Sequence, residues 1–327
     1  MEYIRIKGLE KPISKLIMGS AWMTLEDEPT GHALFDAYFE AGGNVLDTGR
    51  FYGRGSGIAE SERIVGNWLK KSGVKRADIH IIDKAGHPFI TKDGVTHWER
   101  SRISPEFITD DLMYSLDHVG VDYFDIYELH RDNPKVPVAD LMDRLEHHCL
   151  LGQIKAYGVS NWRLDRIQEA IDYCNHMGYQ GLSCNNPSYS LATVKVARFP
   201  GGVYADDAYA SKHKEWDLPI LSWGAQGAGF FAGIYPRDGH GVNGGIIQAY
   251  FSEENFKKLD RCNELGAKKG VDPINLALAY ILNQDFEVAA VIGPQSVKEL
   301  NSSLVGASLK LTPQEVTYLG LKSDTYQ

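Results

Sequence analysis

Four side chains that can exchange protons each lie at or just after a short apolar run of the sequence. They are Asp47 and Tyr52 in NVLDTGRFYG, Lys84 at the end of IHIIDK, and His130 at the end of FDIYELH. A carboxylate, a phenol, an ammonium and an imidazole can together donate a proton to a substrate oxygen. In a β/α barrel the strand ends meet at one rim, so residues far apart in sequence reach one substrate. The four therefore predict a proton-donating active site.

The chemistry of such a site assigns a role to each side chain. A free phenol has a pKa of about 10 and is a poor donor at neutral pH. A nearby ammonium favours the phenolate, so Lys84 is expected to lower the pKa of Tyr52, the proton donor. Asp47 is expected to pair with Lys84 and keep it charged. His130 can hydrogen-bond the substrate oxygen and orient it beside Tyr52. Taken singly, Asp47 is better interpreted as a capping residue and Tyr52 as a packed aromatic, and His130 could be a core histidine. Their joint placement favours catalysis.

Eight short apolar segments supply the strands that would position these residues. They are expected near residues 17–20, 44–48, 79–84, 124–130, 154–161, 181–187, 218–224 and 288–293. Their continuous apolar character is typical of parallel strands buried on both faces. A preceding pair, YIRI and KPIS, predicts an N-terminal hairpin.

Amphipathic segments between the strands carry helix signals. They are expected at 31–43, 59–73, 104–120, 138–152, 163–178, 252–270 and 272–284. Ser104 is expected to cap its helix, with Pro105 at the first helical position. The alternation predicts one (β/α)8 TIM barrel domain spanning residues 1–327. Three connections, 85–103, 188–204 and 225–250, are long and follow strands, which predicts loops over the active-site rim that close on a ligand.

Composition excludes several other classes of protein. The chain has 327 residues and a net charge of −9, which argues against a nucleic-acid surface. The sequence contains no run of eighteen apolar residues, and the N-terminal segment lacks an apolar signal core, so a cytoplasmic protein without a membrane span is expected. Its four cysteines, at 149, 174, 184 and 262, are expected to be free thiols. No set of residues has metal-ligand spacing, so no metal is expected.

Several motifs, in register from about residue 16 to 310, resemble those of the aldo-keto reductases. They are Asp47-Thr48 with Tyr52-Gly53, Glu60-Ser61-Glu62 to Gly66, Lys84, Leu129-His130-Arg131-Asp132, Gly158-Val159-Ser160-Asn161-Trp162, and Gly293. The resemblance implies an eight-stranded barrel that binds a nicotinamide cofactor without a Rossmann domain. It also implies reduction of small-molecule aldehydes or ketones. The aromatic residues expected near the strand ends, with polar rim groups, would suit a sugar-like carbonyl and equally an aromatic aldehyde.

The resemblance also implies which residues bind the cofactor. Ser160 and Asn161 match the pair that holds the nicotinamide carboxamide, and Asn186 stands where the family usually has Gln. Trp223 matches an aromatic that stacks on the nicotinamide ring. The remaining implied contacts are Gly19, Ser20 and Asp47 near the ring, and Gly293, Gln295, Ser296 and Lys298 near the adenosine phosphate.

Departures from the family pattern bear on the choice of cofactor. A basic or Ser residue is common in the family at Gln295, and Glu-Asn is common at Ser302-Ser303. Ser296 and Lys298 remain as partners for a 2′-phosphate. NADP(H) is favoured and NAD(H) is the alternative.

The residues expected to form the substrate pocket come from the ends of the first, second and fourth strands. Trp22 and Phe51 are the expected walls, with His130 and Arg131 beside them. Arg131 and Asp132 are expected to form an ion pair that braces the rim rather than to act in the chemistry.

Two other functions remain open from the sequence. The chain could be a cofactor-binding sensor with negligible turnover, or a lyase that uses Lys84 as a Schiff-base nucleophile. Asp47 argues against the lyase, because a carboxylate raises the lysine pKa when a lowered pKa is needed. The sequence leaves the oligomeric state and the substrate undefined.

Overall fold

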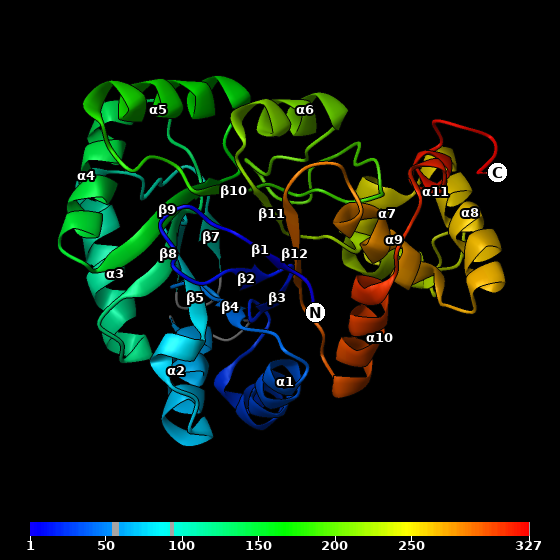
Figure 1. Cartoon of the computed structure of the whole chain (residues 1–327), viewed down its shortest axis with the longest axis horizontal. Helices are drawn as coiled ribbons and strands as arrows, with labels where there is room; N and C mark the ends of the chain where they lie inside the picture. Colours follow the sequence, from blue (N-terminus) through cyan, green and yellow to red (C-terminus); the bar gives the residue numbers. More distant parts are fainter. Residues whose placement is uncertain (54–58, 92–94, 327) are drawn as a thin grey trace.

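The computed structural model describes residues 1–53, 59–91 and 95–326. In this part of the chain, eight parallel strands close into a barrel in the order β10-β11-β12-β3-β4-β5-β8-β9 (Figure 1). The strands are β3 (Leu16–Gly19), β4 (Val45–Asp47), β5 (His80–Ala85), β8 (Phe124–Leu129), β9 (Ile154–Ser160), β10 (Cys184–Asn186), β11 (Ile220–Ser222) and β12 (Val288–Ile292). The predicted (β/α)8 barrel is confirmed, and each strand lies within its predicted segment or shifted from it by one residue.

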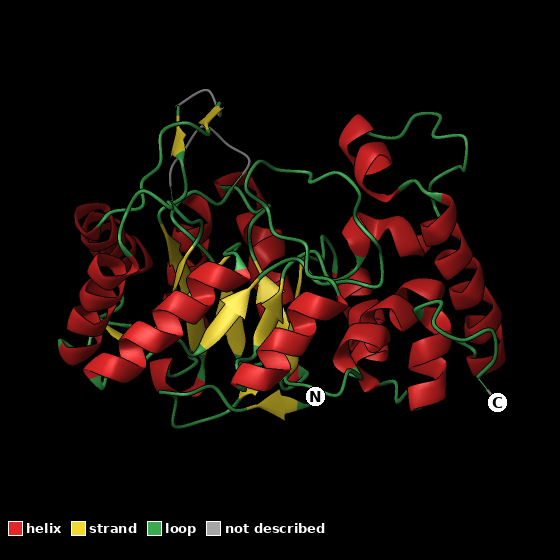
Figure 2. Cartoon of the chain, turned by 90° about the horizontal axis from the view of Figure 1, so that it is seen from above, coloured by secondary structure: helices red, strands yellow, loops and turns green. Residues whose placement is uncertain are grey.

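The two-residue alternation of each strand divides its side chains between the barrel interior and the surrounding helices. Ile17, Val45, Ile82 and Ile126 share one buried apolar cluster inside the barrel. The predicted N-terminal hairpin is present as β1 (Tyr3–Ile4) paired with β2 (Ile13–Ser14). Ile4 and Ile13 join the interior cluster. The hairpin therefore closes the barrel at the end away from the rim loops (Figure 2).

Helices lie around the barrel, and most of them pack on its outer face (Figure 1). They are α1 (Glu28–Glu40), α2 (Glu60–Ser72), α3 (Pro105–Val119), α4 (Val138–Leu150), α5 (Leu164–Met177), α6 (Asp207–Trp216), α7 (Gly244–Tyr250), α8 (Glu253–Lys269), α9 (Pro273–Leu282), α10 (Val297–Ser308) and α11 (Pro313–Leu319), with short 3-10 turns η1 (Leu25–Asp27), η2 (Arg76–Asp78) and η3 (Gly227–Ala232). The predicted cap is present, because the Ser104 hydroxyl accepts a hydrogen bond from the Phe107 amide at 3.3 Å. Gly120 ends the same helix with φ +73°.

The connections after the strands contain more structure than the sequence predicted. The segment 85–103 carries a small hairpin of β6 (Phe89–Ile90) and β7 (Thr96–His97), with residues 92–94 outside the described part. The segment 225–250 contains η3 and α7. Helices α6, α10 and α11 were not predicted. The α6 segment lacks an obvious apolar stripe, because its buried face is made of Tyr209, Ala210 and His213.

Among the described residues, no helix combines the length and the apolar character that crossing a membrane requires.

Candidate active site

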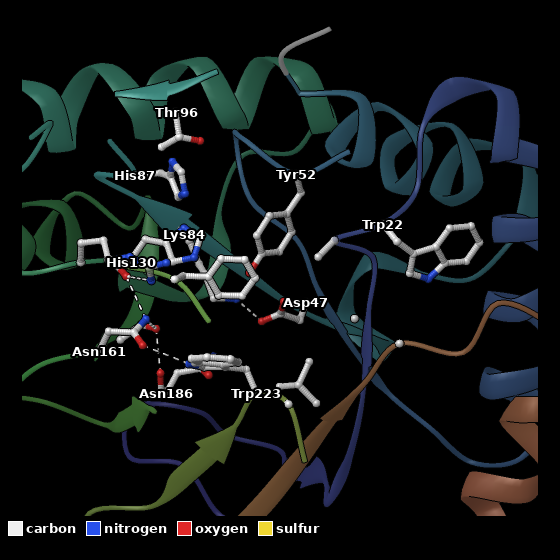
Figure 3. A pocket seen from close by; sticks show the side chains of 18 of the residues that line it. Trp22, Asp47, Tyr52, Lys84, His87, Thr96, His130, Asn161, Asn186 and Trp223 are labelled. Carbon is white, nitrogen blue, oxygen red and sulfur yellow. Dashed lines mark hydrogen bonds and ion pairs between the residues drawn. The ribbon is translucent and has the colours of Figure 1, made fainter. Parts of the chain in front are cut away.

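A pocket of about 420 Å³ lies at the carboxyl ends of the barrel strands. Asp47 ends β4, Lys84 is the second-last residue of β5, and His130 directly follows β8. Tyr52 comes from the loop after β4. All four side chains line the pocket and lie close together (Figure 3). The strand ends thus bring together the residues that the sequence selected, while their roles stay predictions.

Lys84 is held by two buried carboxylates. Its ammonium forms a direct ion pair with Asp47, and its Nζ lies 3.6 Å from Oε2 of Glu128. Burial alone would lower the pKa of Lys84, but Asp47, Tyr52 and Glu128 together raise it above its ordinary value. Lys84 is therefore protonated at neutral pH. A Schiff-base lysine needs the opposite state, a neutral amine, so this geometry opposes the lyase hypothesis.

The pKa of Tyr52 is raised, whereas the sequence argument expected a lowered value. Burial raises the pKa most, Lys84 lowers it, and the carboxylates of Asp47 and Glu128 raise it again. The effect of Lys84 has the expected sign, but burial outweighs it. Tyr52 is therefore a neutral phenol at physiological pH, which is the protonated form that a proton donor requires. The nearby ammonium would stabilise a phenolate at this position.

His130 lies edge-on to Tyr52, with ring centroids 5.6 Å apart. Burial, and then the positive charges of Arg131 and Lys84 together with His87, lower the pKa of His130. The imidazole is therefore neutral and can donate one N–H hydrogen bond to a substrate oxygen. The backbone carbonyl of His130 accepts hydrogen bonds from Arg131 Nη1 at 2.8 Å and Asn161 Nδ2 at 3.3 Å, which fixes the residue in place.

A flat, amide-rich surface lies on the other side of the pocket. Figure 3 shows the Trp223 ring below Lys84 and Tyr52, with Asn161 and Asn186 on the same side. Trp223 Nε1 donates to Asn161 Oδ1 at 3.2 Å, and Asn161 Nδ2 donates to Ser160 Oγ at 2.9 Å. The Oδ1 atom of Asn186 is buried without a hydrogen-bond partner. A planar ring that carries a carboxamide fits here, since the ring could stack on Trp223 and the amide could donate to Asn186.

The residues implied for the adenosine phosphate lie together at the start of α10. Gly293 lines the pocket, and Gln295 and Lys298 are exposed. Ser296 caps the helix by accepting from the Glu299 amide at 3.2 Å, and the Glu299 carboxylate accepts from the Gln295 amide at 2.8 Å. The N-terminus of a helix attracts anions, but Glu299 adds a negative charge. Lys298 is then the nearest cation in this segment for a phosphate.

Five residues predicted for the site do not line the pocket: Gln295, Ser296 and Lys298 near the start of α10, and also Ser20 and Phe51. The hydroxyl of Ser20 donates to the Asp47 carbonyl at 2.8 Å and contacts Ser61 Oγ at 2.5 Å, so it points away from the cofactor side. Gly19 and Ala21, its neighbours, do line the pocket. Phe51 packs against His87, a residue that lines the pocket, with ring centroids 5.6 Å apart. The other expected wall, Trp22, lines the pocket on the side away from His130 (Figure 3).

The predicted ion pair between Arg131 and Asp132 is wrong. Asp132 instead accepts two hydrogen bonds from Arg166, both at 3.1 Å. Arg131 lines the pocket, as predicted, but makes no ion pair with a described carboxylate. Two adjacent residues with opposite charges often point in different directions, so their sequence proximity was a poor guide to pairing.

Glu128 was not predicted as a site residue, although the sequence carries a signal for it. On strand β8, residues 126, 128 and 130 point to the same face because side chains alternate. Lys84 and Glu128 are also direct register partners between β5 and β8. A charged residue two positions before His130 should therefore have been placed inside the barrel. His87 and Trp98, which also line the pocket, come from the 85–103 connection, where periodicity gives no signal.

Replacing Glu128 with Gln is expected to remove one contribution to the pH dependence of the free energy of unfolding, because Gln does not titrate. Burial is the main cause that raises the pKa of Glu128 from 4.5 to about 7, with Asp47 adding to it and Lys84 opposing it. Between these pH values the folded protein holds a proton that the unfolded chain releases. The stabilisation that this proton gives the folded protein is fully present below pH 4.5 and is lost as the pH rises to about 7. Over this range the free energy of unfolding falls by at most ~1.4 kcal/mol per pH unit.

Urea unfolding of both proteins from pH 4.5 to 8 measures this effect. The free energy of unfolding of Glu128→Gln, minus that of the wild type, should increase as the pH rises to about 7 and then level off. The pKa values of Glu62 and Asp83 are also raised by burial, but their titrations are common to both proteins and cancel in the difference. A difference that does not change with pH would contradict the assignment.

Comparison with known proteins identifies a family match over most of the chain. The model of a family described as "Aldo/keto reductase family" matches residues 15–322.

Among the described residues, no group of three His, Cys, Asp or Glu side chains is placed to hold a metal ion.

Curated relatives with similar sequences cover nearly the same span at low identity. The aldo-keto reductase str7 of Strobilurus tenacellus is 26% identical over 93% of this chain and 84% of its own length. The aldo-keto reductase yakc [NADP(+)] of Schizosaccharomyces pombe is 23% identical over 88% of this chain and 81% of its own. Norsolorinic acid reductase stcV of Emericella nidulans is 25% identical over 88% of this chain and 70% of its own length.

Proposed function

Because the chain belongs to the aldo/keto reductase family, we propose that it reduces an aldehyde or ketone to the alcohol with NADPH. When bound, the reduced nicotinamide supplies a hydride to the carbonyl carbon. Tyr52 donates its phenolic proton to the carbonyl oxygen, and Lys84 stabilises the resulting phenolate. His130 donates a hydrogen bond to the same oxygen and sets the carbonyl beside Tyr52. Solvent then restores the Tyr52 proton.

One observation carries this proposal. A neutral phenol lies beside a protonated lysine and edge-on to a neutral imidazole, in a pocket with a flat aromatic floor. The phenol supplies the proton, the lysine stabilises the product anion, and the imidazole orients the oxygen. The floor is formed by Ser160, Asn161, Asn186 and Trp223, and these side chains are suited to hold a nicotinamide.

The test is oxidation of the reduced cofactor with a panel of small aldehydes, ketones and oxidised sugars, followed at the absorbance of NADPH, with NADH in parallel. We expect turnover with at least one carbonyl and faster turnover with NADPH. Tight cofactor binding without turnover of any carbonyl would overturn the proposal and favour the cofactor-binding sensor. The four cysteines are free thiols, which agrees with the cytoplasmic location that we also propose.

Replacing Lys298 with Ala is expected to weaken the binding of NADPH but not that of NADH. If its ammonium pairs with the 2′-phosphate, loss of one charge-assisted contact should raise the NADPH dissociation constant by roughly 10-fold. NADH lacks this phosphate, so its dissociation constant should stay within about 2-fold. Quenching of tryptophan fluorescence during titration measures both constants.

The matched control for this prediction is Lys257→Ala, which removes an exposed lysine on α8. It should change neither constant. The contrary result is that the wild type binds NADPH and NADH equally, with no effect of Lys298→Ala on either dissociation constant. This result would show that the chain does not recognise the 2′-phosphate, and it would favour NAD(H) as the cofactor.

A further inference from the structure

Arg131 presents hydrogen-bond donors that no described residue uses. Its Nη1 donates to the His130 carbonyl at 2.8 Å, but its Nε is buried without a partner. Its Nη2 donates to no described acceptor either. Nε and Nη2 form one edge of the planar guanidinium, and this edge matches the two oxygens of a carboxylate. An arginine without a counter-charge at the wall of a pocket is costly unless a ligand supplies the anion.

The other charges of the pocket leave Arg131 as its uncompensated cation. Lys84 is neutralised by Asp47 and faces Glu128 as well. Burial is the main cause that lowers the pKa of His87 to about 4, and burial also lowers that of His130, so both imidazoles are neutral. Asp132, the carboxylate next in sequence, is held by Arg166. The described lining therefore carries a net positive charge, which lies on Arg131.

We propose that Arg131 forms a subsite for a carboxylate, so that the substrates are carbonyl compounds that also carry a carboxylate group. This inference rests on the proposed reductase function. Arg131 follows His130 directly, so a carbonyl held by His130 and Tyr52 would place its far end toward the guanidinium. The substrate would thus be fixed at two points, the carbonyl oxygen and the carboxylate.

The position of Arg131 favours a substrate group over a cofactor phosphate. The segment predicted to hold the adenosine phosphate begins at Gly293, where an added Cβ would lie 3.8 Å from Trp22 Cδ1. Figure 3 shows Trp22 on one side of the pocket and His130 with His87 on the other. Arg131 belongs to the His130 side. A phosphate bound by Arg131 would lie away from the rest of the predicted cofactor site.

The walls near Arg131 favour a flat apolar body between the two polar groups. Trp98 lies with its ring centroid 5.8 Å from Arg131 Cζ, and Phe199 and Ile90 also line the pocket. A benzene ring that carries an aldehyde and a carboxylate is a small probe with these features. 4-Carboxybenzaldehyde is the anionic probe, and methyl 4-formylbenzoate is a neutral probe of similar shape and carbonyl reactivity.

The experiment compares kcat/KM for these two aldehydes, with the anion-to-ester ratio as the readout. The wild type should favour the anion, mainly through a lower KM. In Arg131→Gln the ratio should fall by roughly 30-fold or more, the loss expected when one partner of a buried charge pair is removed. Arg131→Lys keeps the charge but not the two-donor edge, so it should retain part of the preference. NADPH binding is measured for each variant, because a larger loss there would assign Arg131 to a cofactor phosphate and overturn the inference.

Arg198→Gln is the matched control, because Arg198 is a rim arginine that does not line the pocket. Its ratio should equal that of the wild type. An equal fall in Arg198→Gln would show a general field effect rather than a subsite. A wild-type enzyme that prefers the ester, or an Arg131→Gln ratio equal to that of the wild type, would also overturn the inference.

A binding measurement keeps this inference separate from the reductase proposal. Calorimetric titration of the NADP⁺-loaded protein with 4-(hydroxymethyl)benzoate and with 4-(hydroxymethyl)benzamide needs no turnover. Tighter binding of the benzoate that is lost in Arg131→Gln would support the subsite even if no aldehyde were reduced. Equal binding of the two ligands by the wild type would overturn it.

Discussion

Tyr52→Phe is expected to lower kcat for carbonyl reduction by about 10²- to 10⁴-fold, the usual contribution of a positioned general acid. The substitution removes one oxygen atom and leaves the ring, which packs edge-on to His130. Cofactor binding depends on other residues, so the NADPH dissociation constant should remain within about 3-fold of the wild type. Steady-state turnover and fluorescence titration of the same preparation measure the two quantities.

A second phenol provides the control for this substitution. Tyr127 is buried on β8 outside the pocket, and its hydroxyl makes a long hydrogen bond of 3.5 Å to the Ile108 carbonyl. Tyr127→Phe should therefore keep turnover close to the wild type. Tyr52→Phe with wild-type turnover would remove Tyr52 as the proton donor, and a parallel loss of cofactor binding would assign it a structural role instead.

Lys84→Met is expected to lower both turnover and stability. Without the ammonium, the phenolate of Tyr52 loses its stabilising charge, and Asp47 and Glu128 are left as unpaired buried carboxylates. Removing one partner of a buried ion pair typically costs about 3–5 kcal/mol. Burial already raises the pKa of Asp47 against the opposing effect of Lys84, and loss of Lys84 should raise this pKa further. The variant should therefore be most stable at low pH and lose stability as the pH rises.

The double variant Lys84→Met, Asp47→Asn separates the two effects. It removes one of the stranded carboxylates, so the free energy of unfolding at pH 7 should recover by about 1–3 kcal/mol relative to Lys84→Met. Turnover should not recover, because no ammonium faces Tyr52. Urea unfolding at pH 5 and pH 7, with kcat measured alongside, tests both statements. Recovery of turnover in the double variant would contradict the role assigned to Lys84.

Local sequence signals were sufficient to predict the barrel. The strands are short, apolar on both faces and separated by helices with clear ends, such as Ser104 before α3 and Gly120 after it. Helix α6 was missed because its buried face includes His213, a residue that periodicity counts as polar. Helix α11 carried a readable signal, since Thr312 and Glu315 form a capping box.

The strand ends also predicted which four residues would gather, because the topology of the barrel fixes where each strand ends. Properties that depend on three-dimensional surroundings were not predictable. The pKa of Tyr52 depends on its burial, which outweighs Lys84. Asp132 lies in the loop after β8 and its partner is Arg166 on α5, so the pairing depends on how α5 packs beside the rim. Phe51 packs against His87 and is not part of the pocket lining, a placement that depends on the loop conformation and that no short pattern encodes.

The most direct test of the central claim is transfer of deuterium from reduced cofactor labelled at nicotinamide C4. The protein is incubated with 4-carboxybenzaldehyde or another turned-over carbonyl and each C4-deuterated epimer of NADPH, and the alcohol is analysed by mass spectrometry and proton NMR. We expect one deuterium on the carbinol carbon from one of the two epimers, and about 10²- to 10⁴-fold less labelled alcohol from Tyr52→Phe over the same time. An alcohol formed without deuterium from either epimer, or cofactor binding with no alcohol from any carbonyl, would contradict hydride transfer at this site.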